Sequence, residues 1–387
     1  MEICKKEHCT GCFACINSCT RNCIEMQEDD FGVMHPLVNT DKCIECGACI
    51  RSCPANNETE SCLPIKIYAV VNNNHDEILT CATSGMGWLI SKHTILNGGT
   101  VFATIYDEQL TPRVTEISDI ESLKLTKGSK YVQSLVGEGT LLRIRDLLKN
   151  EVPVTFIGTP CQVAGVKQFL KRDYPHLLLV DLLCHGVVPT SYFKSEVDYL
   201  KKAHQLKHIT DVRFRGNDGN NYVFTMWDKQ GKIYSSRAYS QPYFAGFLYG
   251  TTLRENCFNC RYAKKERVGD ITIGDFIGLG ASIPFEHKKE NVSFLTVNTQ
   301  KGVDLTETLM KTCPQLHFVE RTYEERLVSP NSLLLPTLRH PSVNKFRELY
   351  PHYGYVLSVR KALRKQLLKE HIKEYLLWLK PILKLFK

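Results

Sequence analysis

The residues best suited to chemistry in this chain are its cysteines, which are concentrated near the N-terminus. Of 17 cysteines, eleven lie between Cys4 and Cys62 and six lie in the remaining 325 positions. Eight of the eleven form an internal repeat, because every cysteine of the second copy lies 34 positions after its counterpart in the first. The first copy is Cys9, Cys12, Cys15 and Cys19, and the second is Cys43, Cys46, Cys49 and Cys53, followed by Pro54.

The spacing Cys-x2-Cys-x2-Cys-x3-Cys is typical of a pair of [4Fe-4S] clusters. Three thiolates on a tight, glycine-assisted loop (Gly11 in one copy, Gly47 in the other) bind three irons, and in two-cluster ferredoxins the fourth ligand comes from the other copy. The alternative is a pair of zinc sites, but zinc modules normally use two separate Cys-x2–4-Cys pairs. The predicted ligand sets are Cys9, Cys12, Cys15 and Cys53 for one cluster, and Cys43, Cys46, Cys49 and Cys19 for the other.

The other N-terminal cysteines do not fit the repeat. Cys4, Cys23 and Cys62 are predicted to be free buried thiols and not ligands. In the first copy Cys19 is followed by Thr20 where the second copy has a proline. We expect this difference to alter the local turn and not the ligands.

After Pro64 the sequence changes character, and alternating strand and helix signals predict an α/β region. Residues 65–71 are predicted to form a strand, and Thr83 to Gly87 to open a helix that continues to Leu96. Gly98 and Gly99 are expected to end that helix before a strand over 100–106. The fold class predicted for the chain is therefore an α+β ferredoxin-like N-terminal module, a larger α/β region and a helical C-terminal tail.

Two cysteines follow predicted buried strands. The strand over 152–158 is followed by Thr159-Pro160-Cys161-Gln162, in which threonine suits an N-cap and proline suits the first helical position. Cys161 would then lie at a helix N-terminus, where the helix dipole favours a thiolate. A second strand, over 177–183, brings Cys184 to the same carboxyl edge, where ligands collect in open α/β sheets.

A further pair, Cys257-x2-Cys260, precedes a predicted strand over 270–276. Together with Cys161 and Cys184 these residues supply the four thiolates that a third [4Fe-4S] cluster needs. The alternative gives Cys161 and Cys184 buried structural roles, and makes the pair half of a zinc site or a dithiol.

Two polar stretches are further candidates for binding. Residues 127–134 (KGSKYVQS) combine cations with an aromatic side chain and fit either a solvated loop or a site for an anionic cofactor edge. Residues 213–220 (RFRGNDGN) are predicted to form a strand that leads into a hairpin turn, with arginines that could meet an anionic substrate. Rossmann, P-loop, H-E-x-x-H and G-x-S-x-G motifs do not occur in the sequence, which disfavours nicotinamide, nucleotide and hydrolase functions.

The positive charge of the chain is concentrated in its C-terminal tail. The formal net charge is +8, and residues 360–387 hold nine Lys or Arg against two Glu. A basic nucleic-acid-binding face spread over the domains is therefore not supported. Residues 357–380 are predicted to form a basic amphipathic helix, broken or kinked by Pro381. Such a helix fits an anionic membrane surface, or packing on its own domain or on a second copy in a homo-oligomer.

The sequence also bears on location. The N-terminus has no apolar signal region, and no run of about 18 apolar residues occurs. We expect a cytoplasmic protein with reduced thiols, in peripheral contact with the inner face of the membrane if the basic helix binds lipid.

With these motifs the sequence resembles a known family, the beta subunits of coenzyme F420 hydrogenases and dehydrogenases. The likeness runs from about residue 65 to about residue 340, behind the fused two-cluster domain. It rests on GTPCQVAG (158–165), DLLCHG (181–186), ENCFNC (255–260), GDITIGDF (269–276) and SKYVQS (129–134). The resemblance implies domains at 1–62, 63–150, 151–340 and 341–387, namely the dicluster domain, the two parts of the beta-subunit-like region and the tail.

The resemblance implies FAD and iron–sulfur centres, with Cys161, Cys184, Cys257 and Cys260 as ligands of a third cluster near the flavin. The residues expected beside the flavin are Ser84, Gly85, Ser129, Lys130, Tyr131, Gln133, Thr159 and Gln162. Lys130 is expected to supply charge and Tyr131 to stack or donate a proton. The family suggests a ferredoxin or deazaflavin as redox partner, or a small organic substrate such as an intermediate of polysaccharide biosynthesis. The alternative function is a non-catalytic electron-transfer subunit of a larger oxidoreductase.

Overall fold

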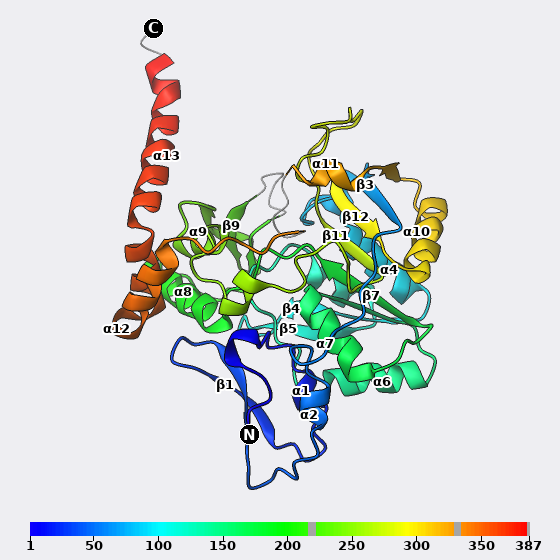
Figure 1. The fold of residues 1–387 in the computed structure, drawn as a ribbon. Coiled ribbons are helices and arrows are strands. Elements are labelled where there is room, and N and C mark those ends of the chain that lie inside the picture. Colours follow the sequence, from blue (N-terminus) through cyan, green and yellow to red (C-terminus); the bar gives the residue numbers. More distant parts are fainter. Residues whose placement is uncertain (216–221, 329–333, 385–387) are drawn as a thin grey trace.

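An eight-stranded mixed sheet forms the centre of the computed structural model, which describes residues 1–215, 222–328 and 334–384 (Figure 1). The strand order is β13-β3-β12-β11-β7-β6-β4-β5. Four neighbouring strands run parallel: β4 (Thr100–Tyr106), β6 (Val154–Gly158), β7 (Leu177–Leu182) and β11 (Ile271–Asp275). The flanking antiparallel strands are β3 (Lys66–Asn72), β5 (Pro112–Ile117), β12 (Ser293–Val297) and β13 (Leu316–Glu320).

Helices cover both faces of this sheet because successive strand residues point to opposite sides. Phe102 and Phe156 pack in one core with α6 (Thr140–Lys149) and α7 (Pro160–Leu170). Val101 and Ala103, their neighbours on β4, pack in another core with α4 (Met86–Leu96) and α10 (Gln300–Thr312). The mixed α/β architecture predicted from the sequence is confirmed.

The N-terminal domain packs against α6 and α7. It contains a hairpin of β1 (Ile24–Glu28) and β2 (Met34–Val38), and the short helices η1 (Lys6–His8), α1 (Ala14–Asn17) and α2 (Ala48–Arg51). Its apolar residues share one core with those of α6 and α7. The buried Asn17 side chain joins the two parts, because it donates to the Gly137 carbonyl and accepts from the Leu141 N–H.

A smaller layer lies to the left of the central sheet in Figure 1. Its three-stranded sheet has the order β10-β9-β8 and shares a core with nearby helices. The strands are β8 (Asp211–Arg213), β9 (Val223–Trp227) and β10 (Lys232–Arg237), and the helices are α8 (Thr190–Ala203), α9 (Pro242–Leu248) and α12 (Ser342–Ala362). The remaining short elements are α3 (His75–Ile78), α5 (Ile120–Leu123), η2 (Lys124–Thr126), η3 (Glu255–Asn259) and α11 (Tyr323–Arg326).

The last helix, α13 (Arg364–Lys384), projects away from the body (Figure 1). The predictions of one helix over 357–380 and of a break at Pro381 are wrong. Two helices meet at Leu363, and α13 continues past Pro381 to Lys384. A proline lacks the N–H that would bond to the carbonyl four residues earlier, so the helix loses one hydrogen bond at this position. No described helix is long and apolar enough to cross a bilayer.

Most other predicted elements are confirmed to within two residues. The strands expected at 65–71, 152–158, 177–183 and 270–276 appear as β3, β6, β7 and β11, and the strand over 100–106 is β4. The strand that was predicted to begin at Arg213 is β8, which ends at Arg213. Residues 216–221 of the predicted turn lie outside the described residues. Strands from both 63–150 and 151–340 join the same central sheet.

Candidate functional site

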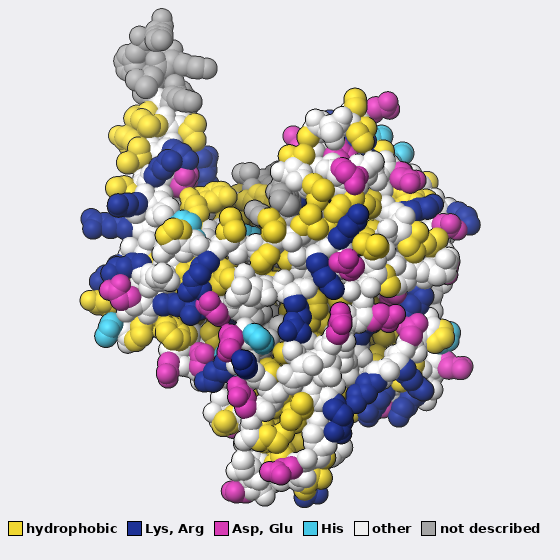
Figure 2. Space-filling view, in the orientation of Figure 1, with side chains coloured by type: hydrophobic (Ala, Val, Ile, Leu, Met, Phe, Trp, Pro, Cys, Tyr) yellow, Lys and Arg dark blue, Asp and Glu magenta, His cyan; other side chains and the backbone are white. Residues whose placement is uncertain are grey.

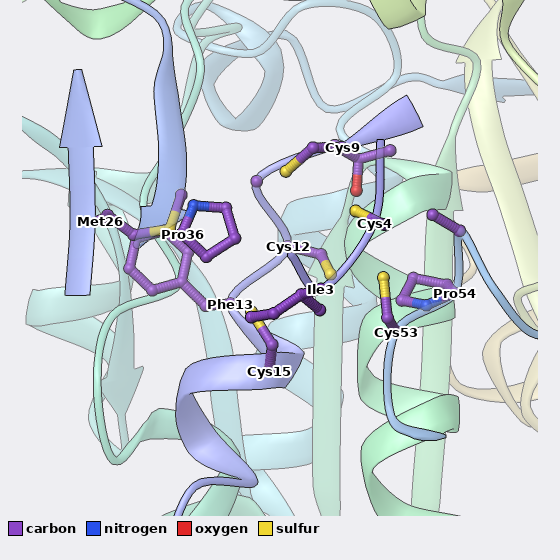
Figure 3. Close-up of a pocket in the computed structure, with 13 residues that line it drawn as sticks. Ile3, Cys4, Cys9, Cys12, Phe13, Cys15, Met26, Pro36, Cys53 and Pro54 are labelled. Atoms are coloured by element: carbon purple, nitrogen blue, oxygen red, sulfur yellow. The ribbon is translucent and has the colours of Figure 1, made fainter. Parts of the chain in front are cut away.

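The first predicted quartet surrounds a small cavity in the N-terminal domain. Cys9, Cys12, Cys15 and Cys53 line it together with apolar side chains such as Ile3 and Phe13 (Figure 3). Burial raises the pKa of the Cys12 thiol to about 12, and the charges of Cys53 and Cys9 add to this shift because they lie nearby. Cys4 lines the same cavity, so five thiols surround it, and the four predicted ligands among them fit the ligand chemistry of a cubane.

The two cysteine loops have the same backbone conformation, although their glycines occupy different places. Gly11 and Phe13 have positive φ angles in the first copy, and Glu45 and Gly47 have them at the equivalent positions of the second. Only glycine adopts such angles without steric cost. In the first copy the second left-handed position holds Phe13, whose buried side chain belongs to the core. The glycine of this copy, Gly11, occupies the first left-handed position.

The second predicted quartet lies closer to the surface. Burial raises the pKa of Cys49, and the charges of Cys19 and Cys43 contribute. Cys46, the remaining member, is exposed. The structure therefore brings Cys49 near two of its predicted companions, with Cys46 on the same short loop.

Two cysteines expected to be free thiols lie directly beside the predicted ligands. A hydrogen bond from Cys4 lowers the pKa of Cys53 to about 7. The sulfur atoms of Cys19 and Cys23 are 3.3 Å apart. The half-buried Cys62 instead forms a backbone bridge with Arg267. Within the described ranges, no three His, Cys, Asp or Glu side chains are placed to share a single metal ion.

Three segments far apart in the sequence bring the other four cysteines together. Cys161 is the second residue of α7, which begins at Pro160 after the N-cap Thr159, as the sequence predicted. The Thr159 N–H donates to the Gln162 side-chain oxygen. Cys184 follows β7, and Cys257 and Cys260 lie on or directly after η3. Burial raises the pKa of Cys184, and the charges of Cys257, Cys161 and Cys260 raise it further, which requires that all four lie close together.

A buried ion pair fixes these segments to one another. Arg267 and Asp181 are 1% and 0% exposed, and their side chains are 2.9 Å apart. The other Asp181 oxygen accepts from the N–H groups of Val268 and Gly269. Because Asp181 lies on β7 and Arg267 lies just after the Cys257–Cys260 segment, the pair sets the position of Cys184 relative to the other two cysteines.

The first quartet lies against the helix that bears Cys161. Gly165 is one turn after Cys161, and a Cβ atom at Gly165 would lie 2.9 Å from Cys12 Cβ and 3.1 Å from Cys12 Sγ. The buried Tyr262 is near both quartets, since burial raises its pKa and the charges of Cys161 and Cys12 add to the increase. The N-terminal domain is therefore docked with its first cysteine loop directly on α7.

A cavity of about 690 Å³ opens at the carboxyl ends of the four parallel strands. Its lining includes Thr104 of β4, Gly158 of β6, Leu182 of β7 and Asp275 of β11. Cys184 also lines it, so the third quartet forms part of its wall. This is the edge at which ligands bind in open α/β sheets.

Six of the eight residues expected beside a flavin line this cavity: Gly85, Ser129, Lys130, Tyr131, Thr159 and Gln162. The other two are buried nearby and are engaged elsewhere. Ser84 donates to the Ser293 hydroxyl, and the Gln133 side chain accepts from Arg254.

The two residues expected to act in catalysis have different surroundings. The half-buried Lys130 donates to the carbonyl groups of Leu125 and Thr126, and burial lowers its pKa to about 8. The Tyr131 ring stacks on Phe247 with 4.5 Å between centroids. Its hydroxyl accepts a hydrogen bond of 3.3 Å from Arg215.

A polar network beside Tyr131 has no clear signal in the sequence. Arg215 donates to Asp275 at 2.6 Å, and the Tyr222 hydroxyl donates to the same carboxylate oxygen at 2.8 Å. Burial raises the pKa of Tyr131, so its phenol is even harder to deprotonate than an ordinary tyrosine, which is protonated at neutral pH. Asp275 ends the strand of the motif GDITIGDF and Arg215 belongs to 213–220, but only the fold shows that these two segments meet.

Two family models match parts of this chain. Residues 153–316 match the family model that describes the C terminus of the coenzyme F420 hydrogenase/dehydrogenase beta subunit, and residues 8–57 match the 4Fe-4S dicluster domain. A chain of the F420-reducing [NiFe] hydrogenase complex from Methanosarcina barkeri, in a xenon-derivatised structure, matches with 12% identity and a TM-score of 0.47, over 81% of this chain and 93% of that chain. No curated protein matches this chain.

The two family-model matches define an iron–sulfur protein with a redox role. Residues 153–316 belong to the coenzyme F420 hydrogenase/dehydrogenase beta subunit family, and residues 8–57 form a 4Fe-4S dicluster domain.

Proposed function

We propose that this chain is an FAD-dependent iron–sulfur oxidoreductase in which three [4Fe-4S] clusters connect a one-electron partner to FAD. The observation that supports the proposal is the position of the third cysteine quartet. On one side, α7, which bears Cys161, contacts Cys12 of the first quartet. On the other side, Cys184 lines the cavity. This order gives electrons a continuous path from the N-terminal domain to the cavity.

The proposed ligands follow from the convergence of the thiols. Each N-terminal cluster takes three cysteines from its own loop and the fourth from the other copy of the repeat. The third is assembled from three segments of the catalytic region. The sets are Cys9, Cys12, Cys15 and Cys53; Cys43, Cys46, Cys49 and Cys19; and Cys161, Cys184, Cys257 and Cys260.

The cavity suits FAD in size and in chemistry. A volume of about 690 Å³ falls within the usual range for cofactor pockets. The first turns of α4 and α7 both line it, and the α4 N-terminus has no side-chain cap. Unpaired N–H groups at a helix N-terminus bind phosphate, so this end of α4 would hold the pyrophosphate. Bound FAD would exchange single electrons with the clusters and two electrons with a substrate.

The chain's own residues would orient the reacting groups and hold a proton. Asp275 fixes the Arg215 guanidinium, which donates to the Tyr131 hydroxyl. Because that hydroxyl accepts from Arg215, its own proton is available for donation into the cavity. Lys130 adds a positive charge on the same loop. A cavity with these groups in its wall favours an enzyme over a relay subunit.

The proposed two-electron partner is a deazaflavin or a small organic substrate, including an intermediate of polysaccharide biosynthesis. The proposed one-electron partner is a ferredoxin. The family resemblance supports the choice of both partners.

The direct test is the metal and flavin content of protein purified without oxygen. We expect about twelve iron atoms per chain, since three clusters hold four each, together with acid-labile sulfide and one FAD. Turnover of a candidate acceptor with reduced ferredoxin, in the absence of other proteins, would support the enzyme. Zinc in place of iron would contradict the clusters. Electron transfer that occurs only to an added partner oxidoreductase would identify a relay subunit.

We also propose that α13 lies against an anionic membrane surface. Leu368, Ile372, Tyr375 and Leu376 are exposed and recur at the spacing of one helical stripe. Lys365 and Lys369 are exposed beside them, and Figure 2 shows hydrophobic and basic side chains together on the projecting helix.

Flotation with vesicles that contain phosphatidylserine tests this contact. Full-length protein should bind, and a chain ending at Leu363 should bind much less. Equal binding by both would contradict the proposal. A change from dimer to monomer on truncation, without vesicle binding by either chain, would show instead that α13 pairs two copies.

A further inference from the structure

Arg254 is a fully buried cation whose hydrogen bonds to described residues all go to neutral groups. Its side chain, 1% exposed, donates to the carbonyl oxygens of Cys9 and Met34, at 2.9 and 3.1 Å. It also donates to the side-chain oxygens of Gln133 and Asn256. No Asp or Glu pairs with it among the residues that the structure describes. A buried charge normally requires a counter-charge, so this arrangement needs an explanation.

Arg267, the other buried arginine compared with Arg254, has a carboxylate of the chain as its counter-charge. Both arginines are almost fully buried, and Arg267 pairs with the equally buried Asp181. Arg254 instead lies between two groups of thiols. Its backbone carbonyl accepts from Cys257, and its guanidinium reaches the Cys9 loop. The counter-charge available at this place is therefore sulfur.

The side-chain amide of Gln133, beside Arg254, has an N–H group without a hydrogen-bond partner among the described residues. Its Oε1 accepts from Arg254 at 2.9 Å, whereas its buried Nε2 has no hydrogen-bond partner among the described residues. A Cβ atom at Gly11, between Cys9 and Cys12, would lie 2.5 Å from that Nε2. The free amide thus faces the loop of the first quartet. A buried donor without an acceptor indicates a group that the chain itself does not provide.

We propose that Arg254 and Gln133 are positioning residues that stabilise negative charge on the clusters of the first and third quartets. The inference rests on the proposed cluster ligands. A [4Fe-4S] cluster with four thiolates is anionic and becomes more so on reduction, so a fixed buried cation favours the reduced form. N–H groups directed at cluster sulfur act in the same direction. Because the guanidinium lies between the two quartets, its charge acts on both clusters, and the Gln133 amide acts on the first alone.

The test is a redox titration of the full-length protein, purified without oxygen and followed by electron paramagnetic resonance. In Arg254→Gln we expect the reduced-to-oxidised ratio of the first and third clusters, at a fixed solution potential, to fall by at least about tenfold, or about 59 mV for a one-electron couple. Arg254→Lys keeps the charge and should retain most of the wild-type ratio. Gln133→Leu should lower the ratio for the first cluster only, and by less.

Arg261→Gln is the matched control. Arg261 also joins the two domains, by donating to the Pro54 carbonyl, and it is close to Cys260, but it is exposed and solvent screens its charge. The control should leave all potentials near wild type, and the cluster of the surface quartet should be unchanged in every variant.

The outcomes separate this inference from the proposed function. Unchanged potentials in Arg254→Gln, or equal shifts in Arg254→Gln and Arg254→Lys, would overturn the role of charge. Iron content of the wild type is measured first. A wild type with only eight irons would contradict the third cluster, while the first cluster would still report on Arg254 and Gln133. If Arg254→Gln does not fold, Gln133→Leu decides whether the pair acts on the first cluster.

Discussion

The N-terminal cysteine loops and the third cysteine quartet gather four thiols in different ways. Each loop places three cysteines within one short turn, and its geometry depends on two left-handed residues, such as Gly11 and Phe13. The third quartet takes Cys161 and Cys184 from the ends of neighbouring strands and two more residues from a distant segment. The loops therefore depend on local backbone conformation, and the third quartet depends on the sheet that carries it.

The largest expected effect is the loss of one cluster without the others. Cys184→Ala removes a thiol that only the third quartet uses, so iron content should fall by about a third while the resonances of the N-terminal clusters persist. Cys313→Ala, at the end of α10, is the control and should keep all iron. Loss of all iron in Cys184→Ala would show that the two regions do not bind clusters independently.

The next largest effect concerns the buried Asp181–Arg267 ion pair, which holds the third quartet's segments on the sheet. Asp181→Asn should lower the free energy of unfolding by about 3–5 kcal/mol, because it leaves Arg267 buried without its counter-charge. Chemical denaturation measures this change. Asp173→Asn removes a carboxylate that is 77% exposed and pairs with Lys301, and it should cost less than about 1 kcal/mol. Similar losses of unfolding free energy in both variants would show that the buried pair stabilises the fold no more than the exposed pair does.

Docking between the two regions is tested at Gly165. In Gly165→Ala the new methyl group would contact Cys12, so the loop must move, at an expected cost of about 1–3 kcal/mol. Gly87→Ala, in α4, meets only Ile273 at 3.4 Å and should be neutral or slightly stabilising. The comparison uses thermal unfolding together with the magnetic coupling between clusters. Unchanged coupling and stability in Gly165→Ala would show that the close approach is unimportant.

The two loops can be compared through their glycines. Gly11→Ala and Gly47→Ala both place a side chain at a positive φ, at an expected cost of about 1–2 kcal/mol each. The loss should be larger at Gly11, where the buried Gln133 amide blocks the methyl group, than at Gly47, which faces the end of Arg51. Denaturation midpoints and iron retention measure the difference. The reverse order would contradict the crowding at Gly11.

The smallest expected effect is a pH dependence at the cavity. Burial lowers the pKa of Lys130 from 10.5 to about 8, so between these values the unfolded chain binds more protons than the folded one. Stability relative to Lys130→Met should therefore increase as pH rises from about 8 to about 10, and it should be flat below about pH 7. Urea titrations at several pH values measure this difference. A decrease over the same interval would contradict the lowered pKa of Lys130.

Much of this arrangement could be predicted from the sequence. The repeat at 34 positions identified the dicluster domain, and the Thr159–Gln162 segment identified the helix start that carries Cys161. The C-terminal helix is an exception, because Pro381 predicts a break and α13 continues through it. The partners of Tyr131 could not be predicted, since Arg215 and Asp275 come from separate segments that meet only in the fold.

The sequence by itself determined which thiols share a loop, since ligand spacing within a few residues is a property of the local backbone. It also determined the strands that end at the cavity, because their apolar runs and caps are local signals. Only the tertiary structure decided that Arg254 and Gln133 lie against the Cys9 loop and that Gly165 contacts Cys12. Contacts between distant segments depend on how whole layers pack, and no short stretch of sequence encodes that packing.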